Sequence, residues 1–118
     1  MIKAGHAIQQ AVAGLSFDDY CNSRLIRSSV ERECIIVGEA LTQLSQRDQE
    51  LFSQIERAAQ IISFRNKLTH EYSKINNQLV WGVIHTTLPG LLDQCAQLLS
   101  DLEGGRRLTI RPAPGGAG

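Results

Sequence analysis

The sequence is poor in aromatic residues, prolines and cysteines, and these shortages exclude several classes of protein. Aromatic residues make up only 5% of the chain and there are three prolines, which suits a helical protein better than a sandwich or a barrel. The three cysteines, Cys21, Cys34 and Cys95, form no C-x-x-C pair and no Cys/His ligand spacing. An odd number of cysteines without a signal peptide predicts a reduced, intracellular protein in which each cysteine is a small core residue.

Long hydrophobic runs are absent as well. No stretch approaches the roughly 20 apolar residues of a membrane span. The N-terminal M-I-K-A-G-H-A-I-Q-Q has no uninterrupted apolar segment of the kind expected in a signal peptide, because His6, Gln9 and Gln10 interrupt its apolar residues. We therefore expect a cytoplasmic protein without a membrane segment. Its 118 residues suffice for one domain, and dimerisation would bury additional surface.

An excess of charge of one sign is also missing, but the charges are unevenly placed. The chain holds 12 Lys+Arg and 12 Asp+Glu. Residues 1–103 hold 9 basic and 12 acidic residues, a net charge of −3, and residues 104–118 hold three Arg and no acid, a net charge of +3. Bulk attraction to nucleic acid is therefore not expected of the folded part, and an RNA ligand would need a local cationic patch or a partner protein.

Apolar residues recur at helical spacing along most of the chain, which predicts an all-α fold. Serines followed three positions later by Asp or Glu mark four predicted helix starts, at Ser16, Ser28, Ser45 and Ser53. The expected elements are a first helix containing Ile8 and Val12, a short helix from Ser16 to near Asn22, a long helix from Ser28 or from near Ser23, a short helix near 46–52, a longer helix near 54–70 and a last helix over 77–102. Together they predict a bundle of four main helices plus one or two short ones.

Three further expectations concern details of this bundle. Ile55, Ala58, Ala59 and Ile62 are predicted to form the buried face of the helix near 54–70. Pro89-Gly90 is predicted to kink the last helix or split it in two. The Gly/Pro/Arg-rich residues 104–118 are predicted to be a flexible tail outside the helical domain of residues 1–103.

Residues 65–72 read R-N-K-L-T-H-E-Y and end a predicted apolar helix with a cluster of functional side chains. Arg can hold a phosphoryl group bidentately, and His can take or give a proton near neutral pH. On a regular helix Arg65 and His70 point about 140° apart, so they converge only if the helix unwinds near His70 or across a two-fold dimer axis. RNA would supply its own 2′-hydroxyl nucleophile, and no carboxylate or Cys/His set suggests a metal. By themselves such residues more often mark an ordinary solvated helix end.

The spacing Arg-x4-His-x-Tyr in this stretch resembles the HEPN toxins of HEPN/MNT toxin–antitoxin pairs, the HepT-like group. The segments L-S-F-D-D-Y, E-C-I-I-V-G-E-A-L-T-Q-L-S and V-W-G-V-I-H-T-T-L-P-G-L are similar to that family in the same order, and the resemblance spans about residues 2–102. It implies an all-α HEPN bundle that forms a homodimer or a higher oligomer. It also implies a toxin that is a metal-independent ribonuclease cleaving tRNA or mRNA, with no cofactor.

The resemblance assigns roles to four residues of the motif. Arg65 and His70 would be the catalytic pair, and Asn66 would position the phosphate or the histidine. Tyr72 matches the tyrosine that the partner MNT nucleotidyltransferase, which uses ATP, modifies with AMP. That modification would add bulk and negative charge beside His70 and so repel the RNA backbone.

Other interpretations stay open for several residues and for the function. Glu39 either supports the motif by pairing with Arg65 or a neighbour, or lies at the edge of an apolar stripe. Arg24, Arg27 and Arg32 either hold RNA or an acidic partner, or form a solvated helix face. The alternative function is a non-catalytic helical partner or substrate-binding subunit of a nucleotidyltransferase, which the net charge of −3 over residues 1–103 favours slightly.

Overall fold

The computed structural model describes residues 1–71, 73 and 75–110, with side chains as far as residue 104. Over these residues the chain forms helices and connecting turns and no strand, which confirms the all-α prediction. The elements in chain order are α1 (Ile2–Val12), α2 (Phe17–Asn22), α3 (Arg24–Arg47), α4 (Gln49–Ser53), α5 (Ala58–His70), α6 (Asn77–Gly82), the π-helix η2 (Val83–Thr87) and α7 (Leu88–Ile110). The four longest, α1, α3, α5 and α7, are the four main helices of the predicted bundle.

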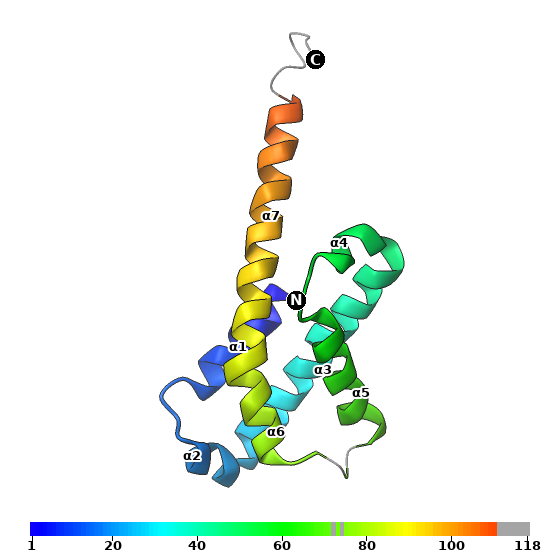
Figure 1. Ribbon diagram of the computed structural model, residues 1–118. Coiled ribbons are helices and arrows are strands. Elements are labelled where there is room, and N and C mark those ends of the chain that lie inside the picture. The colour runs from blue at the N-terminus through cyan, green and yellow to red at the C-terminus, as the bar shows by residue number, and fades with distance from the viewer. Residues whose placement is uncertain (72, 74, 111–118) are drawn as a thin grey trace.

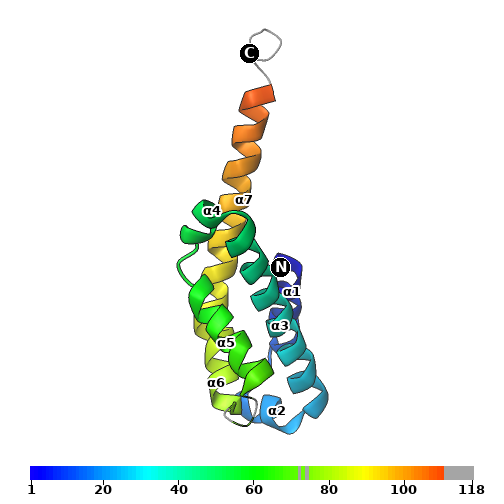
Figure 2. The same ribbon diagram turned by 90° about the vertical axis from the view of Figure 1, so that its right-hand side faces the viewer.

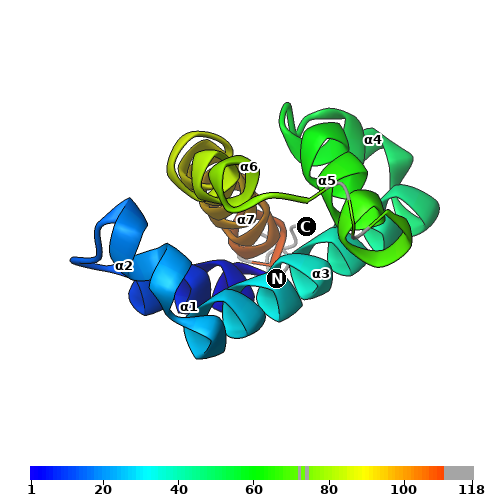
Figure 3. The ribbon, with the colours of Figure 1, turned by 90° about the horizontal axis from the view of Figure 1, so that it is seen from below.

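Helix α3 is the centre of the arrangement (Figures 1 and 3). It packs against α1 over one part of its length and against α5 over another, while α1 also packs against α7. In Figure 2, α5 lies in front of the column formed by α6 and α7, and Figures 1 and 3 show the two next to each other. The C-terminal part of α7 projects beyond the other helices (Figure 1). The helix that carries the R-N-K-L-T-H-E-Y motif therefore packs against α3 and faces the α6–α7 column.

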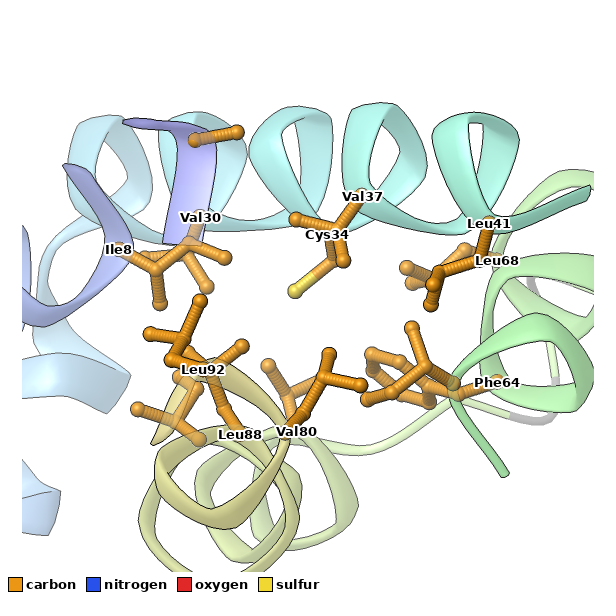
Figure 4. Close-up of a cluster of buried hydrophobic side chains, with 14 of the residues drawn as sticks. Ile8, Val30, Cys34, Val37, Leu41, Phe64, Leu68, Val80, Leu88 and Leu92 are labelled. Atoms are coloured by element: carbon orange, nitrogen blue, oxygen red, sulfur yellow. The ribbon is translucent and has the colours of Figure 1, made fainter. Parts of the chain in front are cut away.

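The core is apolar and draws on five helices. Figure 4 shows side chains of α1, α3, α5, α6 and α7 pointing into one shared space. Helix α3 buries one apolar stripe with spacings of four and three residues, and its members include Val30, Cys34, Val37 and Leu41. Burying each such aliphatic side chain contributes roughly 1.5–3 kcal/mol relative to leaving it exposed, so α3 is fixed in rotation by this stripe.

The structure tests the predicted starts of α2 and α3, which depend on hydrogen bonds between residues close in the sequence. Ser16 and Asp19 form the predicted capping box of α2, in which the Asp19 N–H donates to Ser16 Oγ at 3.0 Å and the Ser16 N–H donates to Asp19 Oδ2 at 3.1 Å. For α3 the earlier of the two predicted starts is correct. Ser23 is the N-cap and accepts from the Ile26 N–H at 3.2 Å, so Ser28 lies inside the helix.

The starts predicted at Ser45 and Ser53 are wrong. Both hydroxyls instead bond backwards to backbone carbonyls, Ser45 Oγ to the Thr42 oxygen at 2.6 Å and Ser53 Oγ to the Glu50 oxygen at 2.7 Å. Serine makes such bonds readily inside a helical turn, so the same letters do not mark a cap. Asp48 caps α4 in their place, accepting from the Leu51 N–H at 3.0 Å.

The buried face of α5, the helix that carries the motif, also differs from the predicted one. Helix α5 begins only at Ala58 and buries Ala58, Ile61, Phe64 and Leu68, while Ala59 is exposed and Ile62 is half-buried. The prediction fails because Ile55, although buried, belongs to the preceding turn rather than to the helix. A register counted from Ile55 is therefore out of phase with the true helix.

The long last helix is interrupted, as predicted, but just before Pro89-Gly90 rather than at it. Residues Val83–Thr87 form a π-helical turn in which the Leu88 N–H bonds to the Val83 oxygen. Proline has no N–H to donate and its ring crowds the preceding turn, and a wider turn accommodates both. Helix α7 then continues to Ile110, past the domain boundary predicted at residue 103. The flexibility of the tail stays a prediction, and residues 111–118 lie outside the described part.

Helix α7 also contacts the turn that precedes α5. The Gln94 side chain accepts from the Glu56 N–H at 2.8 Å and donates to the Gln54 oxygen at 2.6 Å. Both backbone groups belong to the turn that leads into α5, so one side chain of α7 holds this turn in place.

The cysteines form no disulfide. Cys34 and Cys95 are buried, and Cys21 is half-buried. No helix in the described part of the chain is long and apolar enough to cross a membrane.

Candidate active site

The motif residues 65–70 lie on α5, and Glu71 is the C-cap of this helix. The helix stays regular as far as His70, and the Glu71 N–H still bonds to the Lys67 oxygen at 3.0 Å. The helix therefore does not unwind before His70, which was one of the two ways in which Arg65 and His70 could converge. Because they are five positions apart on a regular helix, they point about 140° apart within one chain.

Arg65 is half-buried in the contact between α5 and α3. A Cβ atom at Gly38 of α3 would lie 2.4 Å from Arg65 Cβ and 2.7 Å from Arg65 Cγ, so only glycine fits there without a shift of the helices. The base of the arginine side chain thus rests directly on the backbone of α3.

The Arg65 guanidinium is held from the same helix. Its Nη2 donates to Thr42 Oγ1 at 2.9 Å, and the Thr42 hydroxyl donates in turn to the Gly38 oxygen at 2.9 Å. The hydroxyl is therefore used as both donor and acceptor. Arg65 Nε is buried without a hydrogen-bond partner in the described part of the structure. An arginine whose head is fixed in this way is oriented before any ligand arrives.

Gly38 and Thr42 were not among the residues predicted from the sequence. They flank Glu39 in the segment G-E-A-L-T, and a glycine inside a long helix, which costs roughly 1 kcal/mol relative to alanine, is the signal that could have indicated a close contact. Glu39 itself is exposed on the surface of α3. The hydrogen bond that the structure gives the Arg65 guanidinium goes to Thr42.

His70 and Asn66 are both exposed. His70 is the last residue of α5. Its position at an exposed helix end leaves the ring accessible to a ligand. Asn66 follows Arg65 directly and lies on the solvent side of the helix. Tyr72 lies outside the described residues.

The pKa shifts that can be assigned lie in the core. Burial raises the pKa of Cys34 to about 12, with Glu31 and Glu33 adding to the effect. Burial also raises the pKa of Cys95 and, together with the charge of Glu31, the pKa of Tyr20. Among the described residues, no three His, Cys, Asp or Glu side chains come together as a metal site would require.

A helical bundle that presents an anchored arginine and an exposed histidine on one helix invites comparison with nucleic-acid-processing proteins. The chain matches the family "Ribonuclease HepT-like" over residues 1–98, and it belongs to this family. It is 30% identical over 90 residues to "Putative RNase TTE0752" of Caldanaerobacter subterraneus subsp. tengcongensis, covering 76% of this chain and 80% of the relative. It is 23% identical over 90 residues to "Putative RNase MJ0127" of Methanocaldococcus jannaschii, covering 76% and 74%. No solved structure matches the chain.

Proposed function

We propose that the protein is the toxin of a HEPN/MNT toxin–antitoxin pair and that it cleaves RNA, tRNA or mRNA, without a metal ion. The observation that carries this proposal is the anchored Arg65 on the same helix as an exposed His70, in a chain of the HepT-like ribonuclease family. Arg65 and His70 are the proposed catalytic residues, and Asn66 is the proposed positioning residue.

The proposed reaction uses the 2′-hydroxyl of the RNA as nucleophile. His70 removes the proton of this hydroxyl, the 2′-oxygen forms a bond to the adjacent phosphorus, and the bond from phosphorus to the 5′-oxygen breaks. A second acid, a water or the His70 of a second copy, returns a proton to the leaving 5′-oxygen. The products are a 2′,3′-cyclic phosphate and a free 5′-hydroxyl. Arg65 stabilises the extra negative charge on the pentavalent phosphorane, and its attachment to Thr42 and Gly38 lowers the reorganisation needed.

A dimer would resolve the divergence of Arg65 and His70 within one chain. A two-fold axis near α5 can place Arg65 of one chain beside His70 of the other, so that two such pairs line one cleft. This arrangement explains how two residues that point about 140° apart on one helix can act on the same phosphate.

The outer face of α3 is suited to such a two-fold contact. Arg32, Ile36 and Glu39 line one shallow hollow on this face, and Ile36 is 37% exposed. Arg32 and Glu39 lie about 10 Å apart along the helix on either side of Ile36. Two antiparallel copies of α3 crossing at Ile36 would therefore place each Arg32 opposite the Glu39 of the second copy. Thr42, one turn further along α3, would bring Arg65 to the edge of this contact.

The proposed antitoxin is an MNT-type nucleotidyltransferase that transfers AMP from ATP to Tyr72. Tyr72 is two residues beyond His70 in the sequence, so an added AMP would bring bulk and negative charge next to the proposed base. Tyr72→Phe should lose the increase in intact mass that the partner and ATP produce in the parent protein. An unchanged increase in the variant would show that the acceptor is another residue.

The ribonuclease itself is tested by incubating the purified protein with total tRNA and with an mRNA in the presence of EDTA. The parent protein should cleave, His70→Ala should not, and His6→Ala, which removes an exposed histidine of α1, should cleave like the parent. Equal cleavage by parent and His70→Ala would reject His70 as the catalytic group. Absence of cleavage by a parent protein whose intact mass shows no AMP would instead favour the non-catalytic partner of a nucleotidyltransferase, which the net charge of −3 over residues 1–103 suits.

A further inference from the structure

The charges of the domain are segregated along the sequence. Residues 57–92 hold four Lys or Arg and a single acid, Glu71, for a net charge of +3. The rest of the domain, residues 1–56 and 93–103, holds five basic and eleven acidic residues, for a net charge of −6. The positive part is the part that forms α5, α6 and η2. An RNA chain is therefore repelled by most of this domain and attracted to one part of it.

A groove runs between α5 and the α6–η2 segment in this positive part. Gln60, Ser63 and Lys67 line it from α5, and the half-buried Leu79 and Val83 line it from the opposite wall. Figure 3 shows α5 and α6 next to each other when the molecule is seen from below. The groove thus combines an apolar surface with a hydroxyl, an amide and one ammonium group, which is the mixture that a nucleotide with its base, sugar and phosphate needs.

The polar wall of the groove leads directly to His70. Gln60, Ser63, Lys67 and His70 follow one another at spacings of three and four residues, so they form one stripe along α5. Lys67 and His70 differ by about 60° around the helix and about 4.5 Å along it. Arg65 faces α3 and is not part of this stripe. A ligand that lies in the groove therefore passes His70 of the same chain.

Lys67 is the natural phosphate contact of the groove. Its side chain is exposed, and no carboxylate in the described part of the structure pairs with its ammonium group. Ser63 lies one turn before it and Gln60 two turns before it, so a phosphate at Lys67 would leave the neighbouring nucleotide over the hydroxyl and the amide. The opposite wall offers only Leu79, Val83 and Thr87, and none of these carries charge.

We propose that the groove between α5 and the α6–η2 segment binds single-stranded RNA next to the scissile phosphate, with Lys67 contacting a backbone phosphate, Ser63 and Gln60 contacting the adjoining nucleotide, and Leu79 and Val83 packing against its base. This inference rests on the proposed ribonuclease function, because it assigns the RNA-binding surface of that same site. It explains how a domain with a net charge of −3 can hold RNA.

The test measures binding separately from cleavage. All variants are made in the His70→Ala protein, and the affinity for a short, fluorescently labelled single-stranded oligoribonucleotide is measured by anisotropy at several salt concentrations. Lys67→Gln should weaken binding roughly five- to tenfold at low salt and reduce the slope of log affinity against log salt by about 0.7–1. Lys3→Gln, the same change at an exposed lysine of α1, should alter neither value.

A second pair of variants adds a charge instead of removing one. Ser63→Glu puts a carboxylate into the groove and should weaken binding at least about tenfold. Ser100→Glu adds the same charge to an exposed position of α7, about 20 Å along the helix from Thr87, and should leave binding nearly unchanged. Since all four positions are exposed, thermal unfolding followed by circular dichroism should show parent-like stability for each variant.

Equal effects within each pair would overturn the groove, because bulk charge would then account for binding. Unchanged binding in all four variants, or a His70→Ala protein that does not bind the oligoribonucleotide at all, would overturn it too. If Lys67→Gln and Ser63→Glu bind RNA normally but no longer bind the purified nucleotidyltransferase, the groove binds a protein partner and the proposal is rejected. A further outcome separates the two proposals. If Lys67→Gln and Ser63→Glu weaken RNA binding as expected but the protein with His70 intact does not cleave RNA, the RNA-binding groove is supported and the proposed ribonuclease function is rejected.

Discussion

The Cα atom of Gly38 and the side chain of Arg65 meet so closely that a methyl group between them has no room. A Cβ atom at position 38 would lie 2.4 Å from Arg65 Cβ, whereas ordinary contacts between carbon atoms are about 3.5–4.0 Å. The contact involves the base of the arginine side chain, which cannot swing away while α5 stays in place. Gly38 therefore sets the distance between α3 and α5 and with it the position of the proposed catalytic arginine.

Gly38→Ala should destabilise the protein although alanine is the better helix former. Forcing α3 and α5 apart costs about 1–3 kcal/mol, while helix propensity returns at most about 1 kcal/mol. Gly82→Ala is the matched control, because a Cβ atom at this helical glycine meets nothing within 4 Å. It should raise the free energy of unfolding by up to about 1 kcal/mol. Urea unfolding of both variants checks the prediction, and a stabilising Gly38→Ala would refute the close contact.

Thr42→Val should uncouple the Arg65 guanidinium from α3 with little change in side-chain volume. The half-exposed arginine can turn to water, so the free energy of unfolding should fall by only about 1 kcal/mol. The proposed cleavage rate at saturating RNA should fall by roughly tenfold, because the guanidinium is no longer held in one orientation. Thr42→Ser keeps the hydroxyl and should restore most of the rate. If valine and serine behave alike, the hydrogen bond does not position Arg65.

A charge exchange on α3 tests the proposed dimer. Arg32→Glu and Glu39→Arg should each place like charges opposite one another across the two-fold axis and weaken self-association by at least about tenfold. The double variant restores opposite charges and should dimerise like the parent. Sedimentation velocity over a range of concentrations measures this. A double variant that is as weak as the single ones would rule out this contact, and a parent that stays monomeric would remove the dimer itself.

Much of the fold follows from local sequence patterns. The stripe of α3 and the capping box at Ser16 and Asp19 were predictable because each depends on residues within one or two turns of a helix. The starts at Ser45 and Ser53 were not, because a serine hydroxyl can either cap a helix or bond backwards inside one, and the sequence around it is the same.

For the candidate site, the sequence indicates the functional residues but not the contacts that hold them. The residue types of Arg65 and His70 and their resemblance to a family point to chemistry, but nothing in their spacing says what holds the arginine. Its contacts, Gly38 and Thr42, come from another helix, and their pairing depends on how α3 and α5 pack in three dimensions. The groove lined by Lys67 likewise needs the relative position of α5 and α6, which hydrophobic periodicity does not define.

The buried thiol of Cys34 should make the fold sensitive to alkaline pH. Burial raises its pKa from the ordinary value of 9.0 to about 12 in the folded protein. Below pH 9 the thiol is protonated in both states and contributes no pH dependence. Between pH 9 and about 12 the unfolded chain releases the proton while the folded protein keeps it, so the free energy of unfolding falls by up to about 1.4 kcal/mol per pH unit. Cys34→Ala should be less stable at pH 8, because it leaves a cavity, but should lose less stability than the parent between pH 9 and 11. Urea unfolding at each pH measures both curves, and parallel curves would show that Cys34 ionises as readily in the folded state as in the unfolded one.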